Sequence, residues 1–120
     1  MTALSFIISI RRKFVKPTPF QDEVSRSIDE IEQEMRRIGL WRGEPLRPEQ
    51  MQFKQAFAMD TMTFAQWLQF VFVPRVREAV AANSFPSSSS VGVQAVREFD
   101  GDPDADRLIQ LLSEFDALFE

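Results

Sequence analysis

Apolar and polar positions alternate with the period of an α-helix between residues 18 and 39. Thr18, with Pro19 after it and Gln21 three residues on, has the pattern of a capping box at the start of a helix. Gly39 supplies the left-handed residue at which many helices end. Apolar residues recur every three or four positions and share one face of the predicted helix: Val24, Ile28, Ile31, Met35 and Ile38. We therefore predict one amphipathic helix between the two end signals.

The most apolar part of the chain, residues 57–76, predicts a second long helix. Thr63 and Gln66 form another capping box, and the residues after them leave little polar surface through about Ala82. This pattern is typical of a central helix surrounded by other helices. A strand over residues 70–73 is the competing interpretation, because those residues favour sheets. The length of the pattern and its capping box favour the helix.

Pro74 lies inside this second predicted helix. A proline there deletes the hydrogen bond to the carbonyl of Phe70 and predicts a kink. Arg75 and Arg77 follow directly. A cation after a kink is suited to an anionic ligand, but an ion pair with an acid on a neighbouring helix is the use that so acidic a protein favours.

Shorter patterns lie between the long ones. Residues 48–57, with Phe53 and Phe57 one turn apart, predict a short helix. Residues 83–90 contain a proline and several serines and predict a connecting loop. The residue at the end of this loop, Ser90, predicts the cap of a further short helix.

The last helix of the chain is predicted to begin at a turn in which Asp102 caps and Pro103 takes the first helical position. Its apolar face consists of Leu108, Leu111, Leu112, Phe115 and Leu118. Together the patterns predict one all-α, four-helix-bundle-like domain over residues 18–120, with three longer helices and one or two short ones.

Residues 1–17 do not continue these patterns. An apolar stretch from Ala3 to Ile10 is followed by a basic cluster of Arg11, Arg12, Lys13 and Lys16. A signal peptide would carry its basic residues before the apolar ones, and a membrane helix would need about 20 apolar residues. We interpret residues 1–17 as a poorly ordered N-terminal extension, with an added strand or helical turn on the core as the alternative.

The composition restricts the chemistry. The 120 residues include 12 Phe, two Trp and no Tyr, so the aromatic side chains are best explained as packing material for one core. Cysteine and histidine are absent, which excludes disulfides, thiol nucleophiles, Ser-His pairs and imidazole or thiolate zinc sites. We therefore expect no cofactor, and the composition leans against an enzyme.

The aspartates near the C-terminus have the alternate spacing of a calcium-binding loop: Asp100, Asp102, Asp104 and Asp106. Counted from the first of them, the glycine position holds Ala105 and the bidentate glutamate position holds Leu111. The calcium pattern therefore fails. Acidic residues that stabilise the start of a helix are the better explanation, and no metal site is expected.

The net charge of −4 conceals an asymmetry. Residues 1–20 carry four basic residues and no acid, so residues 21–120 carry −8. Such an acidic body repels a phosphate backbone, and direct nucleic-acid binding by it is disfavoured. The basic N-terminal cluster remains suited to RNA or an anionic lipid. With no membrane span predicted, we expect a cytoplasmic protein.

Asp60 is the candidate catalytic residue, because it stands in an apolar neighbourhood just before a helix start. Burial would raise the pKa of its carboxyl and make it a candidate acid or base. The alternative is an Asx-type turn, in which the carboxylate accepts backbone N–H bonds from the turn that begins at Asp60. The structural role is favoured.

The candidate binding residues follow Asp60 on the second helix. Gln66 and Gln69 flank Trp67 and would line a pocket with hydrogen-bonding groups around an aromatic wall. Phe70 and Arg75 extend this surface towards the proline. Equally, Gln66 closes the capping box and Gln69 faces water.

The string FAMDTMTFAQWLQFVFVPR, residues 57–75, resembles the YqcC-like family of small bacterial proteins. The resemblance continues in EFDALF, residues 114–119, and begins near residue 20. It implies an all-helical, four-helix-bundle-like fold and an association with a bacterial tRNA pseudouridine synthase. Catalysis by this chain itself fits poorly, since such synthases use a mixed sheet, a stacking tyrosine and a basic surface.

Two functional hypotheses follow. The first is a non-enzymatic accessory or binding module that holds a protein partner or small ligand with an exposed part of residues 57–76, which predicts an apolar patch or groove there. The second is an enzyme of tRNA modification that acts through Asp60, which predicts that this carboxyl lies in an open cleft with a basic rim.

Overall fold

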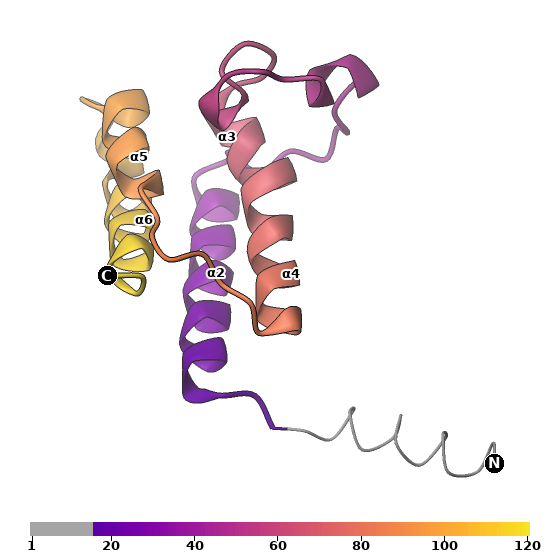
Figure 1. Cartoon of the computed structure of the whole chain (residues 1–120). Helices are drawn as coiled ribbons and strands as arrows, with labels where there is room; N and C mark the ends of the chain where they lie inside the picture. Colours follow the sequence, from indigo (N-terminus) through magenta and orange to yellow (C-terminus); the bar gives the residue numbers. More distant parts are fainter. Residues whose placement is uncertain (1–15) are drawn as a thin grey trace, which may run out of the picture.

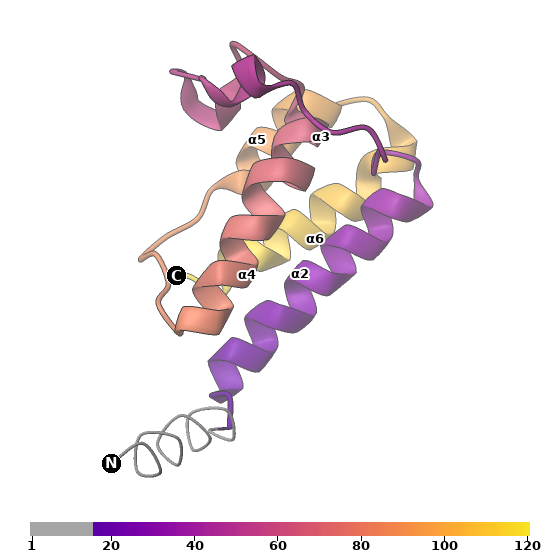
Figure 2. The same ribbon diagram turned by 90° about the vertical axis from the view of Figure 1, so that its right-hand side faces the viewer.

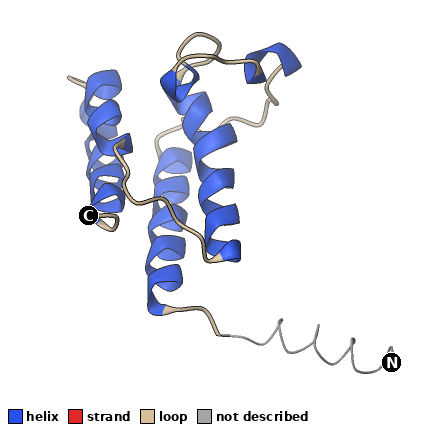
Figure 3. Ribbon diagram, viewed as in Figure 1, coloured by secondary structure: helices blue, strands red, loops and turns tan. Residues whose placement is uncertain are grey.

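The computed structural model describes residues 16–120 (Figure 1). The prediction for the N-terminal extension therefore falls largely outside the described residues. Within them all regular structure is helical and no strand is present (Figure 3). The α-helices are α2 (Pro19–Arg37), α3 (Phe64–Trp67), α4 (Val73–Ala82), α5 (Val91–Phe99) and α6 (Asp106–Ala117). The short turns are η1 (Pro48–Met51), η2 (Ala56–Ala58), η3 (Leu68–Phe72) and η4 (Pro103–Ala105), of which η3 is π-helical and the others are 3₁₀.

Helix α2 has the predicted bounds and cap. The Thr18 hydroxyl accepts from the N–H of Gln21, whose side-chain oxygen accepts from the N–H of Thr18 in return. Gly39 ends the helix with a φ of +80°. Its apolar face is fully buried at Val24, Ile28, Ile31 and Met35. The helical period therefore identified both the element and the face that packs on the core.

Between residues 16 and 120 the bundle consists of four helical arms, and α2 packs against both α6 and α4 (Figures 1 and 2). The segments α3, η3 and α4 follow one another without a break and form one arm. α5 and α6 pack against each other. The all-α, four-helix-bundle-like prediction is confirmed. The expectation that the arm ending in α4 is surrounded on all sides is wrong, because Pro74, Arg75, Arg77 and Glu78 are exposed.

Pro74 is accommodated by the π-helical turn η3 directly before it. The N–H of Val73 donates to the carbonyl of Leu68, five residues back, so the backbone is wider at this point than an α-helix. Proline has no N–H to offer the carbonyl of Phe70, and its ring needs room on that side of the helix. The wide turn supplies that room inside the arm.

A row of aromatic rings runs through the core. Trp67 stacks on Phe64 and on Phe72, with centroids 5.8 Å and 5.5 Å apart. Phe72 meets Phe115 edge-on at 5.1 Å, and Phe115 lies 5.0 Å from Phe119. The row thus links the arm of α3 and α4 to α6. Each such pair contributes about 0.5–1.5 kcal/mol beyond the area that it buries.

Two local predictions are corrected. The single short helix over residues 48–57 is two 3₁₀ turns, and Phe57 has a φ of +57°, which ends any regular helix there. Ser90 precedes α5 but makes no side-chain cap. Instead the Asp116 carboxylate accepts from the N–H groups of Val91 and Gly92, at 3.0 Å and 2.7 Å. A side chain from α6 therefore caps α5, which local sequence does not reveal.

Gly92 allows α5 and α6 to touch. A Cβ at this position would lie 2.7 Å from the Cα of Ser113 and 2.9 Å from an Asp116 carboxylate oxygen. We expect Gly92→Ala to lower the free energy of unfolding by about 1–3 kcal/mol, because the backbone contact outweighs the better helix propensity of alanine. Urea unfolding followed by circular dichroism measures the change.

The matched control is Gly43→Ala, since a Cβ at Gly43 meets nothing within 4 Å. This substitution should change the free energy of unfolding by no more than about 0.5 kcal/mol. Equal effects of the two substitutions would contradict the close packing of α5 on α6.

Candidate functional site

Asp60 lies on the surface and not in an apolar pocket. Its carboxylate accepts from the backbone N–H groups of Lys54 and Gln55, at 3.0 Å and 3.3 Å. The first of these bonds is the main reason why the pKa of Asp60 lies below its ordinary value. The expectation that burial raises this pKa is wrong. The carboxylate closes the loop before it, and a catalytic role for Asp60 stays a prediction.

The candidates on α3 and η3 make internal contacts. Gln66 completes the capping box with Thr63, as predicted. Gln69 is 7% exposed, accepts from the Arg42 N–H at 2.9 Å and donates to the Arg42 carbonyl at 2.6 Å. Neither residue lines the apolar cleft described below. The Gln66 amide bonds to the backbone at the start of α3, and the Gln69 amide bonds the backbone of Arg42 to the helical arm.

Trp67 and Phe70 differ in exposure. Trp67 is 9% exposed and lies within the aromatic row, with the Phe57 ring edge-on at 5.0 Å. Phe70 is half-buried. The aromatic wall expected around Trp67 therefore exists, but it is part of the core.

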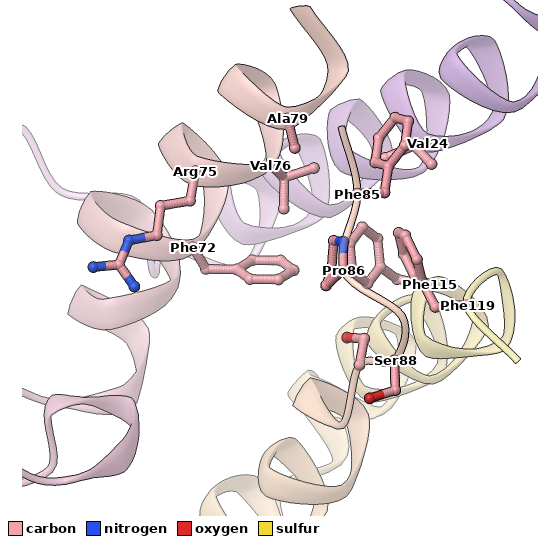
Figure 4. A pocket seen from close by; sticks show the side chains of 11 residues that line it. Val24, Phe72, Arg75, Val76, Ala79, Phe85, Pro86, Ser88, Phe115 and Phe119 are labelled. Carbon is pink, nitrogen blue, oxygen red and sulfur yellow. The ribbon is translucent and has the colours of Figure 1, made fainter. Parts of the chain in front are cut away.

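An apolar cleft lies further along, where α4 faces α6 and the connection between α4 and α5 (Figure 4). Its volume is about 180 Å³. The lining residues are Val24, Phe72, Arg75, Val76, Ala79, Phe85, Pro86, Ser88, Ser89, Phe115 and Phe119. Phe72, Phe115 and Phe119 of the aromatic row line this cleft and are themselves largely buried. It is the strongest candidate site in the described part of the chain.

Arg75 gives the cleft its charge. Its side chain is exposed, and its guanidinium points away from the phenyl rings (Figure 4). Arg75 forms no ion pair with any residue from 16 to 120. By contrast, Arg77 binds Asp29 at 2.8 Å and Glu32 at 2.9 Å, and these bonds raise its pKa. The predicted ion pair is therefore formed by Arg77, while Arg75 is exposed at the cleft.

Sequence reasoning missed most of the cleft. It identified Arg75 and placed Phe72 and Val76 in the apolar region, but it assigned Ser88 and Ser89 to a solvated loop. Residues from α2, from the loop between α4 and α5 and from α6 are distant in the sequence and come together only when the chain folds. No spacing in the sequence indicates this contact. The cleft is a surface that can bind an apolar group beside an anionic one.

The described residues give two further limits. Between residues 16 and 120, no group of three or more acidic, histidine or cysteine side chains is arranged to hold a metal ion. No helix described here is long and apolar enough to cross a membrane. Asp102, from the alternate aspartates, accepts from the N–H of Asp104 and caps η4, as its predicted helix-start role requires.

Known proteins resemble this chain over most of its length. A family model described as tRNA pseudouridine synthase C matches residues 23–118. The uncharacterised protein YqcC of Escherichia coli (strain K12) is 30% identical over 101 residues, covering 82% of this chain and 92% of that protein. An uncharacterised protein of Haemophilus influenzae is 27% identical over 104 residues, covering 83% and 92%.

One solved structure and one named protein add to these matches. The solution NMR structure of YqcC from E. coli has a TM-score of 0.76 at 28% identity and covers 85% of this chain and 89% of that one. A Pectobacterium carotovorum protein named tRNA pseudouridine synthase C is 34% identical over 56 residues. That match covers 47% of this chain and 15% of the Pectobacterium protein.

The bonds of Asp60 predict a pH dependence for the loop that it closes. Because the folded-state pKa is lowered, the stabilisation is present above the unfolded pKa of about 3.9 and is lost as the pH falls through the folded value. We expect the amide resonances of Lys54 and Gln55 to move together below about pH 3.9 in heteronuclear NMR spectra.

Asp60→Asn is the control for this titration. The asparagine keeps an oxygen acceptor but does not titrate, so the acid-dependent movement of both amide resonances should disappear. Movement that persists unchanged in Asp60→Asn would show that another group controls the loop.

Proposed function

Because this chain belongs to the YqcC-like family, whose model is described as tRNA pseudouridine synthase C, we propose that it is a non-enzymatic binding module that associates with a tRNA pseudouridine synthase. Its partner-binding surface is the apolar cleft lined by Phe72, Arg75 and Val76. The proposal keeps the expected role of residues 57–76 but moves the contact to their C-terminal end.

The match to the Pectobacterium protein is the observation that carries the choice of partner. A segment similar to part of this chain lies within a protein named as the synthase, and most of that protein lies outside the match. Two units joined in one chain are held at high effective concentration. Binding of the synthase by the present chain would likewise bring the corresponding units together.

The chemistry of the cleft supports binding over catalysis. Its lining offers apolar side chains, one guanidinium and two hydroxyls, with no carboxylate among the lining residues. One of the hydroxyls, that of Ser89, donates to the Asp116 carboxylate that caps α5. General acid–base catalysis needs a group of suitable pKa within reach of the substrate. This lining instead fits an apolar side chain with an acidic group beside it.

The charge of the body supports a protein partner over direct contact with tRNA. Residues 21–120 carry −8, and three glutamates line a groove beside α2 and α6: Glu23, Glu30 and Glu114. A phosphate backbone is repelled by such a surface. The synthase supplies the RNA-binding surface in this proposal, and the present chain binds the synthase.

The proposal predicts a stable complex with the tRNA pseudouridine synthase C of the same organism. Arg75→Glu should weaken the complex at least tenfold, about 1.4 kcal/mol, because the reversed charge repels the acidic group of the partner. Isothermal titration calorimetry with the two purified proteins measures the affinity. The isolated chain, incubated with unmodified tRNA, should form no pseudouridine.

Arg97→Glu is the matched control, since Arg97 is exposed on α5, outside the cleft, and in no ion pair within residues 16–120. It changes the net charge equally and should leave the affinity within about twofold. Absence of a wild-type complex, or equal weakening by both substitutions, would overturn the proposal. Pseudouridine formation by the chain alone that is lost in Asp60→Asn would favour the enzyme hypothesis.

A further inference from the structure

The apolar cleft opens beside the point at which the described chain begins. Val24, in the second turn of α2, lines the cleft. Phe20, in the first turn, meets the rings of two lining residues edge-on, Phe85 at 5.0 Å and Phe119 at 5.6 Å. The first turn of α2 therefore lies next to the cleft.

The residues before α2 have the composition to fill it. The stretch from Ala3 to Ile10 contains five large apolar side chains: Leu4, Phe6, Ile7, Ile8 and Ile10. A cleft of about 180 Å³ is comparable to a cavity of about 150 Å³ that holds a benzene molecule, so it has room for one large apolar side chain. Full burial of one such side chain stabilises a protein by roughly 1.5–3 kcal/mol relative to leaving it in water.

The chain length is sufficient. From Pro19 to Val24 the helix rises about 8 Å, and the three residues from Lys16 to Pro19 span at most about 10 Å. An extended chain from Lys16 back to Ile10 reaches about 20 Å, and back to Leu4 about 40 Å. The apolar stretch can therefore return to the cleft without any change in α2.

The charges are complementary as well. A returning chain brings Arg11, Arg12, Lys13 and Lys16 to the end of the bundle where α6 terminates. The last turn of α6 has no basic residue, so its negative dipole end has no cation of its own. The nearby groove has three glutamates and one cation, Arg26. Four more cations would reduce this excess of negative charge.

We propose that the N-terminal segment of this chain, residues 3–16, docks on its own bundle, with one apolar side chain from the stretch Ala3 to Ile10 in the cleft and the basic cluster against the acidic end of α2 and α6. The segment then competes with any partner for the cleft. This competition rests on the proposed function, whereas the docking itself does not.

The natural absence of cysteine makes a direct test possible in the full chain. Cysteine is placed at Leu4, Phe6, Ile7, Ile8 or Ile10, one at a time, together with Ser88→Cys at the exposed mouth of the cleft. A disulfide requires Cα atoms within about 7 Å, so the bond reports close approach. Mild oxidation of dilute protein, followed by mass spectrometry of the monomer, measures the rate.

The matched control pairs the same N-terminal cysteines with Arg97→Cys, an exposed position on α5 outside the cleft. We expect at least one N-terminal position to bond to residue 88 at least tenfold faster than to residue 97. Equal rates at both positions, or no bond to residue 88 from any of the five positions, would overturn the docking. Circular dichroism confirms that each variant retains its helical content.

A second measurement separates docking from the proposed function. Ile7→Asp with Ile8→Asp removes apolar character from the segment and leaves the bundle unchanged. If the segment occupies the cleft, the double substitution should slow disulfide formation to residue 88 from whichever of positions 4, 6 and 10 bonds fastest, and should tighten synthase binding at least threefold. Slower bonding without any synthase complex would retain the docking and reject the proposed partner. Unchanged bonding would reject the docking, whether or not the synthase binds.

A binding assay with RNA or anionic vesicles gives the remaining outcome. Binding that depends on the basic cluster, together with no disulfide to residue 88, would show that the segment serves an external partner and does not dock on the bundle.

Discussion

The continuous packing of aromatic side chains is the constraint on which this bundle depends. The row begins at Phe57 in the loop before α3, passes through Trp67, Phe72 and Phe115, and ends where Phe20 meets Phe85 and Phe119. It therefore connects the loop, the arm of α3 and α4, α6 and α2. Phenylalanine suits this role because its whole ring can be buried without a hydrogen-bond partner, which explains a chain with 12 Phe and no Tyr. The cleft is lined by one end of this row, at Phe72, Phe115, Phe119 and Phe85.

Polar side chains hold the connections between the helices around this row. Gln69 binds both backbone groups of Arg42, Asp60 binds the N–H groups of Lys54 and Gln55, and Asp116 caps α5. Each is a side chain that satisfies backbone groups for which the loops offer no other partner. These contacts explain why Gln66, Gln69 and Asp60 resemble site residues in the sequence. Their polar atoms are already engaged in the fold.

Function in this protein therefore has to be sought where side chains are not engaged. Arg75 meets that condition, since it is exposed at the cleft and follows directly on the widened turn and Pro74. The wide turn and the proline interrupt the regular α-helical spacing between Leu68 and Val76. π-Helical turns of this kind are frequent at functional sites. The acidic body and the one guanidinium of the cleft are the observations on which the proposed protein partner rests.

The sequence alone determined the longer helical segments, the buried face of α2, the caps at Thr18, Thr63 and Asp102, and the family. These features depend on residues within a few positions of one another, where the helical period and the capping chemistry act directly. Only the tertiary structure decided that Asp116 caps α5 in place of Ser90, that Asp60 reaches back to Lys54, and that Arg77 takes the ion pair while Arg75 remains at the cleft. The cleft is lined by residues as far apart in the sequence as Val24 and Phe119. Their meeting depends on how three helices and a loop pack together, and that packing is set by side-chain shape and not by any local pattern.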